Sequence, residues 1–284
     1  MTKRTITHLL HEAIQQLKKA GASTPELDAE VLLAKILATD RTWLIAHPQQ
    51  PLTPAQTQQF RTLIERRVRH EPLAYITGER WFYDILLHVS PATLIPRPET
   101  EELVNLALSW LQAHPQAIVA DIGTGSGAIA LALAKHAPSP VHIFATDISV
   151  AALTVARENA RRLQLEQRII FLQGDILTAL PEPVNLIVAN LPYVAERDRA
   201  TLMPEVRDFE PQNALFSGPA GLNHMQRLLS QAPAYLRPGG AMLLEIGFDQ
   251  ADAVRALVRQ QFPFAAVRIH QDLAGHDRVL VIET

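Results

Sequence analysis

Apolar residues recur every three or four positions along the first 76 residues, which is the spacing of helices that bury one face. Two of these runs open on Thr-Pro, where threonine can cap a helix and proline fits its first turn. Helices are expected to begin near Ile6, Thr24 and Thr53, with short helical pieces around Trp43 and Tyr75. The pattern predicts a small helical bundle, and the sequence leaves open whether it is a packing accessory or a module that docks a partner.

The pattern changes after this region. Residues 80–89 combine aromatic and β-branched side chains, which predicts a hairpin. From about residue 117, short apolar strands alternate with amphipathic helices, and two strands joined by a turn close the chain. Such alternation indicates a mainly parallel sheet with helices on both faces. We therefore expect a helical domain over residues 1–78, a hairpin linker over 79–94 and an α/β domain over 95–284.

Composition excludes several classes of protein. The 284 residues include no cysteine, so disulfides, thiolate zinc sites and thiol nucleophiles are excluded. The net charge of -3 argues against a strongly basic nucleic-acid binder. A local basic cluster is formed by Arg61, Arg66, Arg67, Arg69 and His70; it is expected to be a solvated helix face, and contact with an acidic partner or RNA stays open. No apolar run reaches the ~18 residues of a membrane span. Histidines do not form HExxH or another ligand set. We expect a cytoplasmic protein with no membrane contact and no metal.

A glycine-rich loop, DIGTGSG at residues 121–127, joins a predicted strand to a predicted helix. Glycines let the chain turn sharply and let a ligand approach bare backbone, and the helix start offers free N–H groups. With Ala128 the spacing also satisfies the looser dinucleotide fingerprint G-x-G-x-x-G/A, so a nicotinamide-dependent oxidoreductase stays open. The candidate cofactor-binding residues here are Gly123, Thr124, Gly125, Ser126 and Gly127.

Two acidic residues follow the next strands. Asp147 ends the second strand, where a carboxylate can accept hydrogen bonds from both ribose hydroxyls of a nucleoside-bearing cofactor. Its alternative role is to support the following helix start, shared with Ser149. Asp175 ends the third strand and could bind an exocyclic amine, with Ile176 packing on an adenine face. For Asp175 alone, a turn residue after Gly174 is the better interpretation.

The fourth strand, VNLIVA, ends on Asn190, Leu191, Pro192 and Tyr193. Two carbonyl oxygens, from the Asn190 side chain and the Leu191 main chain, could accept the two hydrogens of an NH2 group. Pro192 restrains Leu191, and Tyr193 could supply a flat face. These four residues are therefore candidates for substrate binding and catalysis on a planar amide or amine. The same four residues could also form an ordinary Asn-x-Pro turn.

The tip resembles the N-P-P-Y motif of S-adenosylmethionine-dependent amino-group methyltransferases. Together with IPRPETE at 95–101, the glycine loop, Phe209-Glu210-Pro211 and DLAGHDRV at 272–279, it resembles the release-factor glutamine N5-methyltransferase family over nearly the whole chain. The resemblance implies a Rossmann-like methyltransferase sheet, mainly parallel with its last strand antiparallel, behind a small all-helical domain. It also implies methyl transfer from S-adenosylmethionine, which becomes S-adenosylhomocysteine, to a glutamine in the GGQ motif of peptide chain release factors.

In that family, the positions matching residues 123–127 and Asp147 bind the methyl donor, and those matching Asp175 and Ile176 flank its adenine. The positions matching 190–193 hold the glutamine, and Asn190 also borders the donor. One departure stands out, since the family has proline where this chain has Leu191. A main-chain carbonyl does not require proline, so we expect activity to survive. Alternatives are an exocyclic-amine DNA methyltransferase, which the acidic net charge disfavours, and a ribosomal-protein glutamine methyltransferase.

Overall fold

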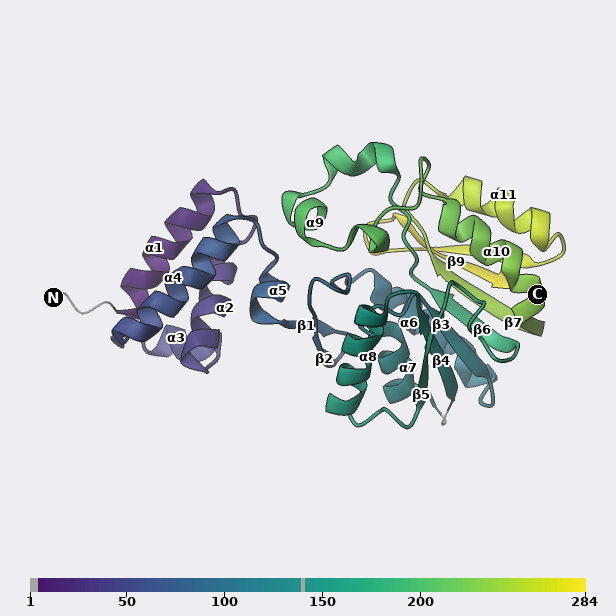
Figure 1. The fold of residues 1–284 in the computed structure, drawn as a ribbon, viewed down its shortest axis with the longest axis horizontal. Coiled ribbons are helices and arrows are strands. Elements are labelled where there is room, and N and C mark those ends of the chain that lie inside the picture. Colours follow the sequence, from purple (N-terminus) through teal and green to yellow (C-terminus); the bar gives the residue numbers. More distant parts are fainter. Residues whose placement is uncertain (1–4, 139–140) are drawn as a thin grey trace. The chain divides into compact units, whose positions relative to one another are not determined.

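The computed structural model describes residues 5–138 and 141–284 (Figure 1). The chain forms two compact units. The first contains the described residues up to Gly78 together with Met203–Phe209, and the second contains Glu79–Leu202 and Glu210–Thr284. The first unit is therefore built from two distant stretches of sequence, and the second carries the sheet.

The first unit is a helical bundle with its own apolar core. Leu9, Leu17, Leu32 and Phe60 are almost completely buried in it. The predicted capping box is present, since Thr53 Oγ1 accepts from Gln56 N and Gln56 Oε1 accepts from Thr53 N. Its helices are α1 (Ile6–Lys19), α2 (Pro25–Leu37), α3 (Arg41–Ala46), α4 (Pro54–Val68), α5 (Leu73–Thr77) and α9 (Pro204–Phe209).

A buried ion network crosses this unit. Arg67 is 5% exposed, and its guanidinium donates to Asp28 Oδ2 at 2.7 Å and to Glu205 Oε2 at 2.7 Å. The expectation that the arginine cluster is a solvated face is therefore wrong for Arg67. Thr24 occupies the N-cap position of α2, but its hydroxyl donates to Asp28 Oδ1 and makes no capping bond to the backbone. A buried carboxylate is stable only when hydrogen-bond donors or cations pair with it. Asp28 is such a group, which explains why Arg67 is buried and why the Thr24 hydroxyl bonds to Asp28 in place of the helix backbone.

The second unit contains a two-stranded hairpin and a seven-stranded sheet. The hairpin strands are β1 (Glu79–Phe82) and β2 (Ile85–His88). The strands of the large sheet are β3 (Ile118–Ile122), β4 (His142–Asp147), β5 (Ile169–Gln173), β6 (Val184–Ala189), β7 (Leu236–Glu245), β8 (Ala266–Gln271) and β9 (Asp277–Glu283). Its helices are α6 (Thr100–Ala113), α7 (Ala128–His136), α8 (Val150–Arg162), α10 (Asn223–Tyr235) and α11 (Ala251–Gln261), with short 3-10 turns at Glu196–Thr201 and Gln212–Ala214.

The large sheet has the order β5-β4-β3-β6-β7-β9-β8. Neighbours from β5 to β7 pair in parallel, and β9 runs antiparallel between β7 and β8. This confirms the predicted mainly parallel sheet with an antiparallel last strand. Because the strand order reverses direction at β3 and β6, right-handed crossovers place α7 and α8 on one face and α10 and α11 on the other (Figure 1).

The register of the central strands brings their carboxyl ends to one edge of the sheet. Ile122 of β3 lies opposite Thr146 of β4 on one side and Ala189 of β6 on the other. All three side chains are buried. The loops that follow these strands therefore begin at the same level, next to one another, which is where ligands bind in open α/β sheets.

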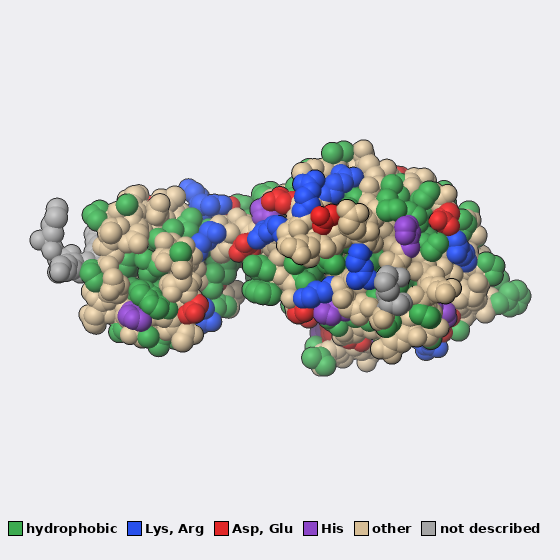
Figure 2. Space-filling model, turned by 90° about the horizontal axis from the view of Figure 1, so that it is seen from below, with side chains coloured by type: hydrophobic (Ala, Val, Ile, Leu, Met, Phe, Trp, Pro, Cys, Tyr) green, Lys and Arg blue, Asp and Glu red, His purple; other side chains and the backbone are tan. Residues whose placement is uncertain are grey.

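Charged side chains of both signs are mixed on one face of the molecule (Figure 2). On the face drawn in Figure 2, acidic and basic side chains of the described residues are interspersed over the unit that carries the sheet. Among the described residues, no helix combines the length and apolar character that crossing a bilayer requires.

Replacing Arg67 by alanine leaves the Asp28 carboxylate buried without its cation. We expect the stability of the helical unit to fall by about 3 kcal/mol, since breaking a buried pair strands a charge. Arg66→Ala is the matched control, because the Arg66 side chain is 33% exposed in its pair with Glu71 and its loss should cost about 1 kcal/mol or less. Amide hydrogen exchange of α2 and α4 in the full chain measures both, and equal losses would contradict the buried network.

Candidate active site

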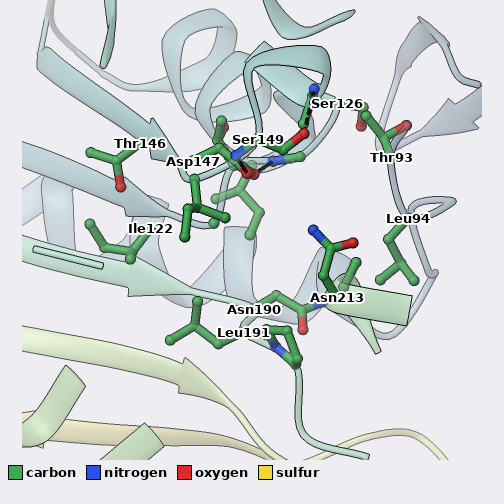
Figure 3. Close-up of a pocket in the computed structure, with 18 of the residues that line it drawn as sticks. Thr93, Leu94, Ile122, Ser126, Thr146, Asp147, Ser149, Asn190, Leu191 and Asn213 are labelled. Atoms are coloured by element: carbon green, nitrogen blue, oxygen red, sulfur yellow. Dashed lines mark hydrogen bonds between the residues drawn. The ribbon is translucent and has the colours of Figure 1, made fainter. Parts of the chain in front are cut away.

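A cavity of about 180 Å³ opens at the carboxyl edge of the sheet. Its walls come from the glycine loop after β3, the ends of β4 and β5, the tip of β6 and the loop before α6. Figure 3 shows Asp147 on one side of it and Asn190 with Leu191 on the other. The cavity brings together the candidate residues Gly123, Thr124, Gly125, Ser126, Asp147, Asp175, Ile176, Asn190, Leu191 and Pro192.

The glycine loop is shaped by its backbone. The N–H groups of Gly123 and Thr124 both donate to the Thr146 carbonyl, at 2.9 Å each, so the loop folds back over the end of β4. Gly125 has a φ of +57°, and a Cβ added there would meet no atom closer than 3.9 Å. Because Gly125 lines the cavity, such a Cβ would occupy ligand space. The glycine thus leaves a cradle that any other residue would partly fill.

Asp147 supports this loop and also faces the cavity. Its Oδ2 accepts from Gly125 N at 2.9 Å and its Oδ1 accepts from Ser149 N at 2.8 Å. Burial raises the pKa of this carboxyl, and the backbone N–H groups oppose that shift. Both alternatives from the sequence are therefore compatible with its position. A carboxylate has about four lone-pair sites, so its backbone donors leave capacity for a hydroxyl donor of a ligand.

Asp121 lies beneath the loop and is fully buried. Its Oδ2 accepts from Thr124 Oγ1 at 2.6 Å and from Ala130 N at 3.1 Å. Its Oδ1 has no hydrogen-bond partner within the part of the chain that the structure describes. Burial raises the pKa of Asp121 to about 7, against the lowering effect of these two donors. The carboxyl holds the loop to the start of α7.

Asp175 and Ile176 follow β5 and also line the cavity. Asp175 lies two residues beyond the last residue of β5 and pairs with Arg227 of α10. Ile176 is buried, with a φ of +56°, and its carbonyl accepts from Thr146 Oγ1 at 3.2 Å. An apolar side chain thus lies beside an acidic one, as a planar base with an exocyclic amine would require.

The tip of β6 presents the opposite wall. Asn190 Nδ2 donates to Thr100 Oγ1 at 2.9 Å, and among the described residues its Oδ1 accepts no hydrogen bond. Leu191 is buried, and its Cδ2 would lie 2.9 Å from a Cβ placed on Gly123, whose φ is +73°. The Leu191 side chain therefore packs directly on the glycine loop. The two walls of the cavity are in contact through this pair.

Tyr193 has a different environment from the other tip residues. It is absent from the described lining of the cavity, and its hydroxyl donates to Glu245 Oε1 at 3.4 Å. Burial and the neighbouring Glu245 raise its pKa. Gln250 Nε2 donates to its carbonyl at 2.9 Å, which fixes the backbone after the tip. The predicted stacking role stays a prediction.

Sequence reasoning missed several residues of this site. Thr100 lies inside the IPRPETE segment at 95–101, which is one of the motifs that carry the family resemblance. Glu245 is the last residue of β7 and lies at the same edge of the sheet, so the sequence pattern could have identified both residues. Asn213, on a 3-10 turn, and His224 and Arg227, on α10, also line the cavity and had no such signal. The wall formed by 92–97 is held by the buried Glu210, which accepts from Ile95 N at 3.2 Å and from Arg97 at 2.6 Å.

The arrangement suits an organic cofactor. The open cradle at Gly125, the carboxylate of Asp147 and the Asp175–Ile176 pair match a nucleoside with an anionic or polar tail. Among the described residues, no group of three histidine or acidic side chains is arranged to hold a metal. Asn190 lies across the cavity from Asp147 and Ser126, where a second reactant would meet the cofactor (Figure 3).

Comparison with known proteins identifies the family. Residues 8–78 match the PrmC N-terminal domain model, and residues 113–273 match a methyltransferase domain model. The chain is 43% identical to the release factor glutamine methyltransferase of Moorella thermoacetica, over 96% of each chain. It is 45% identical to the one of Xylella fastidiosa strain 9a5c, over 94% of this chain and 96% of that protein.

The chain belongs to the release factor glutamine methyltransferase family. The predicted membership is confirmed. A solved methyltransferase from Pyrococcus furiosus, 15% identical, covers 80% of this chain and 97% of its own with a TM-score of 0.50, and it supports the fold alone. In this methyltransferase family member, the cavity at the sheet edge is therefore the candidate active site.

The buried Asp121 should make stability depend on pH. Its folded pKa of about 7 exceeds its ordinary value of 3.8, so the folded state holds the proton more tightly and stability falls as pH rises between those values. Asp121→Asn keeps an acceptor for Thr124 and Ala130 and removes this titration. We expect the midpoint of urea unfolding to fall less in the variant than in the wild type from about pH 5 to about pH 8. An unchanged pH dependence would refute the buried ionisation.

Proposed function

We propose that this protein transfers a methyl group from S-adenosylmethionine to the side-chain amide nitrogen, N5, of a glutamine in a peptide chain release factor. The observation that carries the proposal is the Asn190 carboxamide, whose oxygen accepts no hydrogen bond from the described residues at the wall opposite the glycine cradle. Family membership supports the same substrate class. The GGQ loop of the release factor is the target that the proposal names.

The donor is assigned to the side of the cavity with the glycine loop. The backbone of 123–126 would receive its polar tail, Asp147 its ribose hydroxyls, and Ile176 and Asp175 the face and amine of its adenine, while Gly127 does not line the described cavity. When bound, this sulfonium compound supplies an electrophilic methyl carbon. Leu191 packs against Gly123, so the donor loop and the substrate tip are held at a fixed separation.

An amide nitrogen is a poor nucleophile because its lone pair is delocalised into the carbonyl. Asn190, Leu191 and Pro192, the tip residues that line the described cavity, include no strong base, and none is required. Asn190 Oδ1 and the Leu191 carbonyl accept the two N–H groups of the substrate amide and orient its nitrogen toward the cavity. As the nitrogen bonds to the methyl carbon and the carbon–sulfur bond breaks, the nitrogen gains positive charge, and these fixed acceptors stabilise that charge until one N–H proton leaves to solvent. Positioning contributes the remainder.

Two competing substrates would fit the same chemistry. An exocyclic amine of DNA also carries a planar NH2 group, and a glutamine of a ribosomal protein carries the same amide. The interspersed charges on the face drawn in Figure 2 and the net charge of -3 favour a protein over DNA.

The decisive experiment is mass spectrometry of purified release factor incubated with the protein and S-adenosylmethionine. One added methyl on the GGQ glutamine is expected, and a release factor with that glutamine replaced by leucine should gain none. Methylation of DNA or of a ribosomal protein instead of the release factor would overturn the assignment.

Asn190→Ala and Asp147→Asn should separate the two halves of the site. Removing one preorganised acceptor lowers kcat about 100-fold in Asn190→Ala, with donor affinity changed little. Asp147→Asn should weaken donor binding about 10-fold or more, since charged hydrogen bonds contribute roughly 1.5–3 kcal/mol. Calorimetry with S-adenosylmethionine and single-turnover methylation measure the two effects. Loss of donor binding in Asn190→Ala would show that Asn190 binds the donor, and it would contradict its assignment to the substrate side of the site.

Leu191→Pro restores the residue that the family carries. Because the Leu191 carbonyl already serves as the acceptor, we expect the wild type to be active and the variant to stay within about threefold of its kcat, since no hydrogen bond is gained. An inactive wild type that the substitution rescues would show that leucine disables the tip.

A further inference from the structure

A chain of hydrogen bonds runs from Asn190 into the interior of the second unit. Asn190 Nδ2 donates to Thr100 Oγ1 at 2.9 Å, and Thr100 Oγ1 donates to Glu245 Oε2 at 2.7 Å. Thr100 is 3% exposed and Glu245 is 1% exposed. The three residues come from the tip of β6, the first turn of α6 and the last position of β7. Three separate elements therefore meet behind the carboxamide.

The direction of this chain follows from the chemistry of its end. An ionised carboxylate only accepts hydrogen bonds, and a hydroxyl has one proton to donate. Thr100 must therefore donate its proton to Glu245, which leaves only oxygen lone pairs facing Asn190. Of the two ends of the Asn190 amide, only the NH2 group can bond to lone pairs. The amide oxygen is consequently left on the side away from Thr100.

We propose that Thr100 and Glu245 are positioning residues that fix the orientation of the Asn190 carboxamide, so that its oxygen faces the substrate amide. This inference rests on the proposed function. A flipped amide would present NH2 to the NH2 of the substrate, so two donors would meet and the acceptor would be lost. Neither residue acts on the reacting atoms, and both act through Asn190.

The charge on Glu245 determines the direction of the chain. Arg278 of β9, Glu99 before α6 and Tyr193 after β6 face it, and Arg97 lies within electrostatic reach of Tyr193. Burial raises the pKa of Glu245 to about 7, while Thr100 and Arg278 lower it and Glu99 raises it. Once protonated, Glu245 can donate to Thr100, whose own proton then turns toward Asn190 and favours the flipped amide.

The test compares Thr100→Val with Thr100→Ser in the full-length protein, using methylation of the release factor. Valine matches the shape of threonine and removes the hydroxyl, so kcat should fall about 10-fold or more while the donor Kd stays within about twofold. Serine keeps the hydroxyl and should retain kcat within about threefold. Equal losses in both variants, or no loss in valine, would overturn the proposal.

The pH dependence of kcat is a second readout, and it does not depend on whether the Thr100→Val variant folds correctly. In the wild type, kcat should fall as pH drops through about 7, where Glu245 gains its proton. Glu245→Gln keeps an acceptor for Thr100 and cannot titrate, so this acid limb should disappear. Asp121→Asn removes the other buried carboxyl with a pKa of about 7 and should leave the limb in place. An acid limb that persists in Glu245→Gln contradicts the proposal.

Failure of the inference and failure of the proposed function give different results. If the wild type adds no methyl to the release factor, the proposed function fails. If the wild type is active and Thr100→Val matches it, the function stands and the positioning role of Thr100 and Glu245 is refuted.

Discussion

Parallel pairing of β3 with β4 on one side and β6 on the other is the constraint on which the site depends. It places Ile122, Thr146 and Ala189 at one level, so the three following loops start side by side. The glycine cradle, Asp147 and Asn190 are far apart in sequence and share one cavity for this reason. Antiparallel pairing would send the loops after adjacent strands to opposite edges.

Behind each wall of the cavity lies a buried carboxyl. Asp121 holds Thr124 and the start of α7, and Glu245 holds Thr100 and Tyr193. Burial raises the pKa of both to about 7. Such carboxyls reduce the stability of the fold when they ionise. They also fix the direction of the hydrogen bonds made by their neighbours, which apolar residues at the same positions could not do. The site thus depends on interior polar groups as much as on those that line it.

Most of the fold followed from local patterns in the sequence. The capping box at Thr53, the strand-loop-helix at 121–127 and the alternation of strands and helices depend on neighbouring residues, so the sequence predicts them directly. Arg67 and Thr24 differ from expectation because their partner, Asp28, is contributed by packing. The Tyr193–Glu245 and Asn190–Thr100 pairs join residues 52 and 90 positions apart, so no local spacing reveals them. For the same reason, the directions in which the Asn190 and Tyr193 side chains point could not be predicted from the sequence.

The most direct measurement is a crystal structure of the protein with S-adenosylhomocysteine and a release-factor peptide that carries the glutamine. The account predicts that Asn190 Oδ1 lies about 2.9 Å from the glutamine amide nitrogen, with its own NH2 group on Thr100. An Asn190 side chain turned away from the glutamine, or a glutamine bound elsewhere, would contradict it.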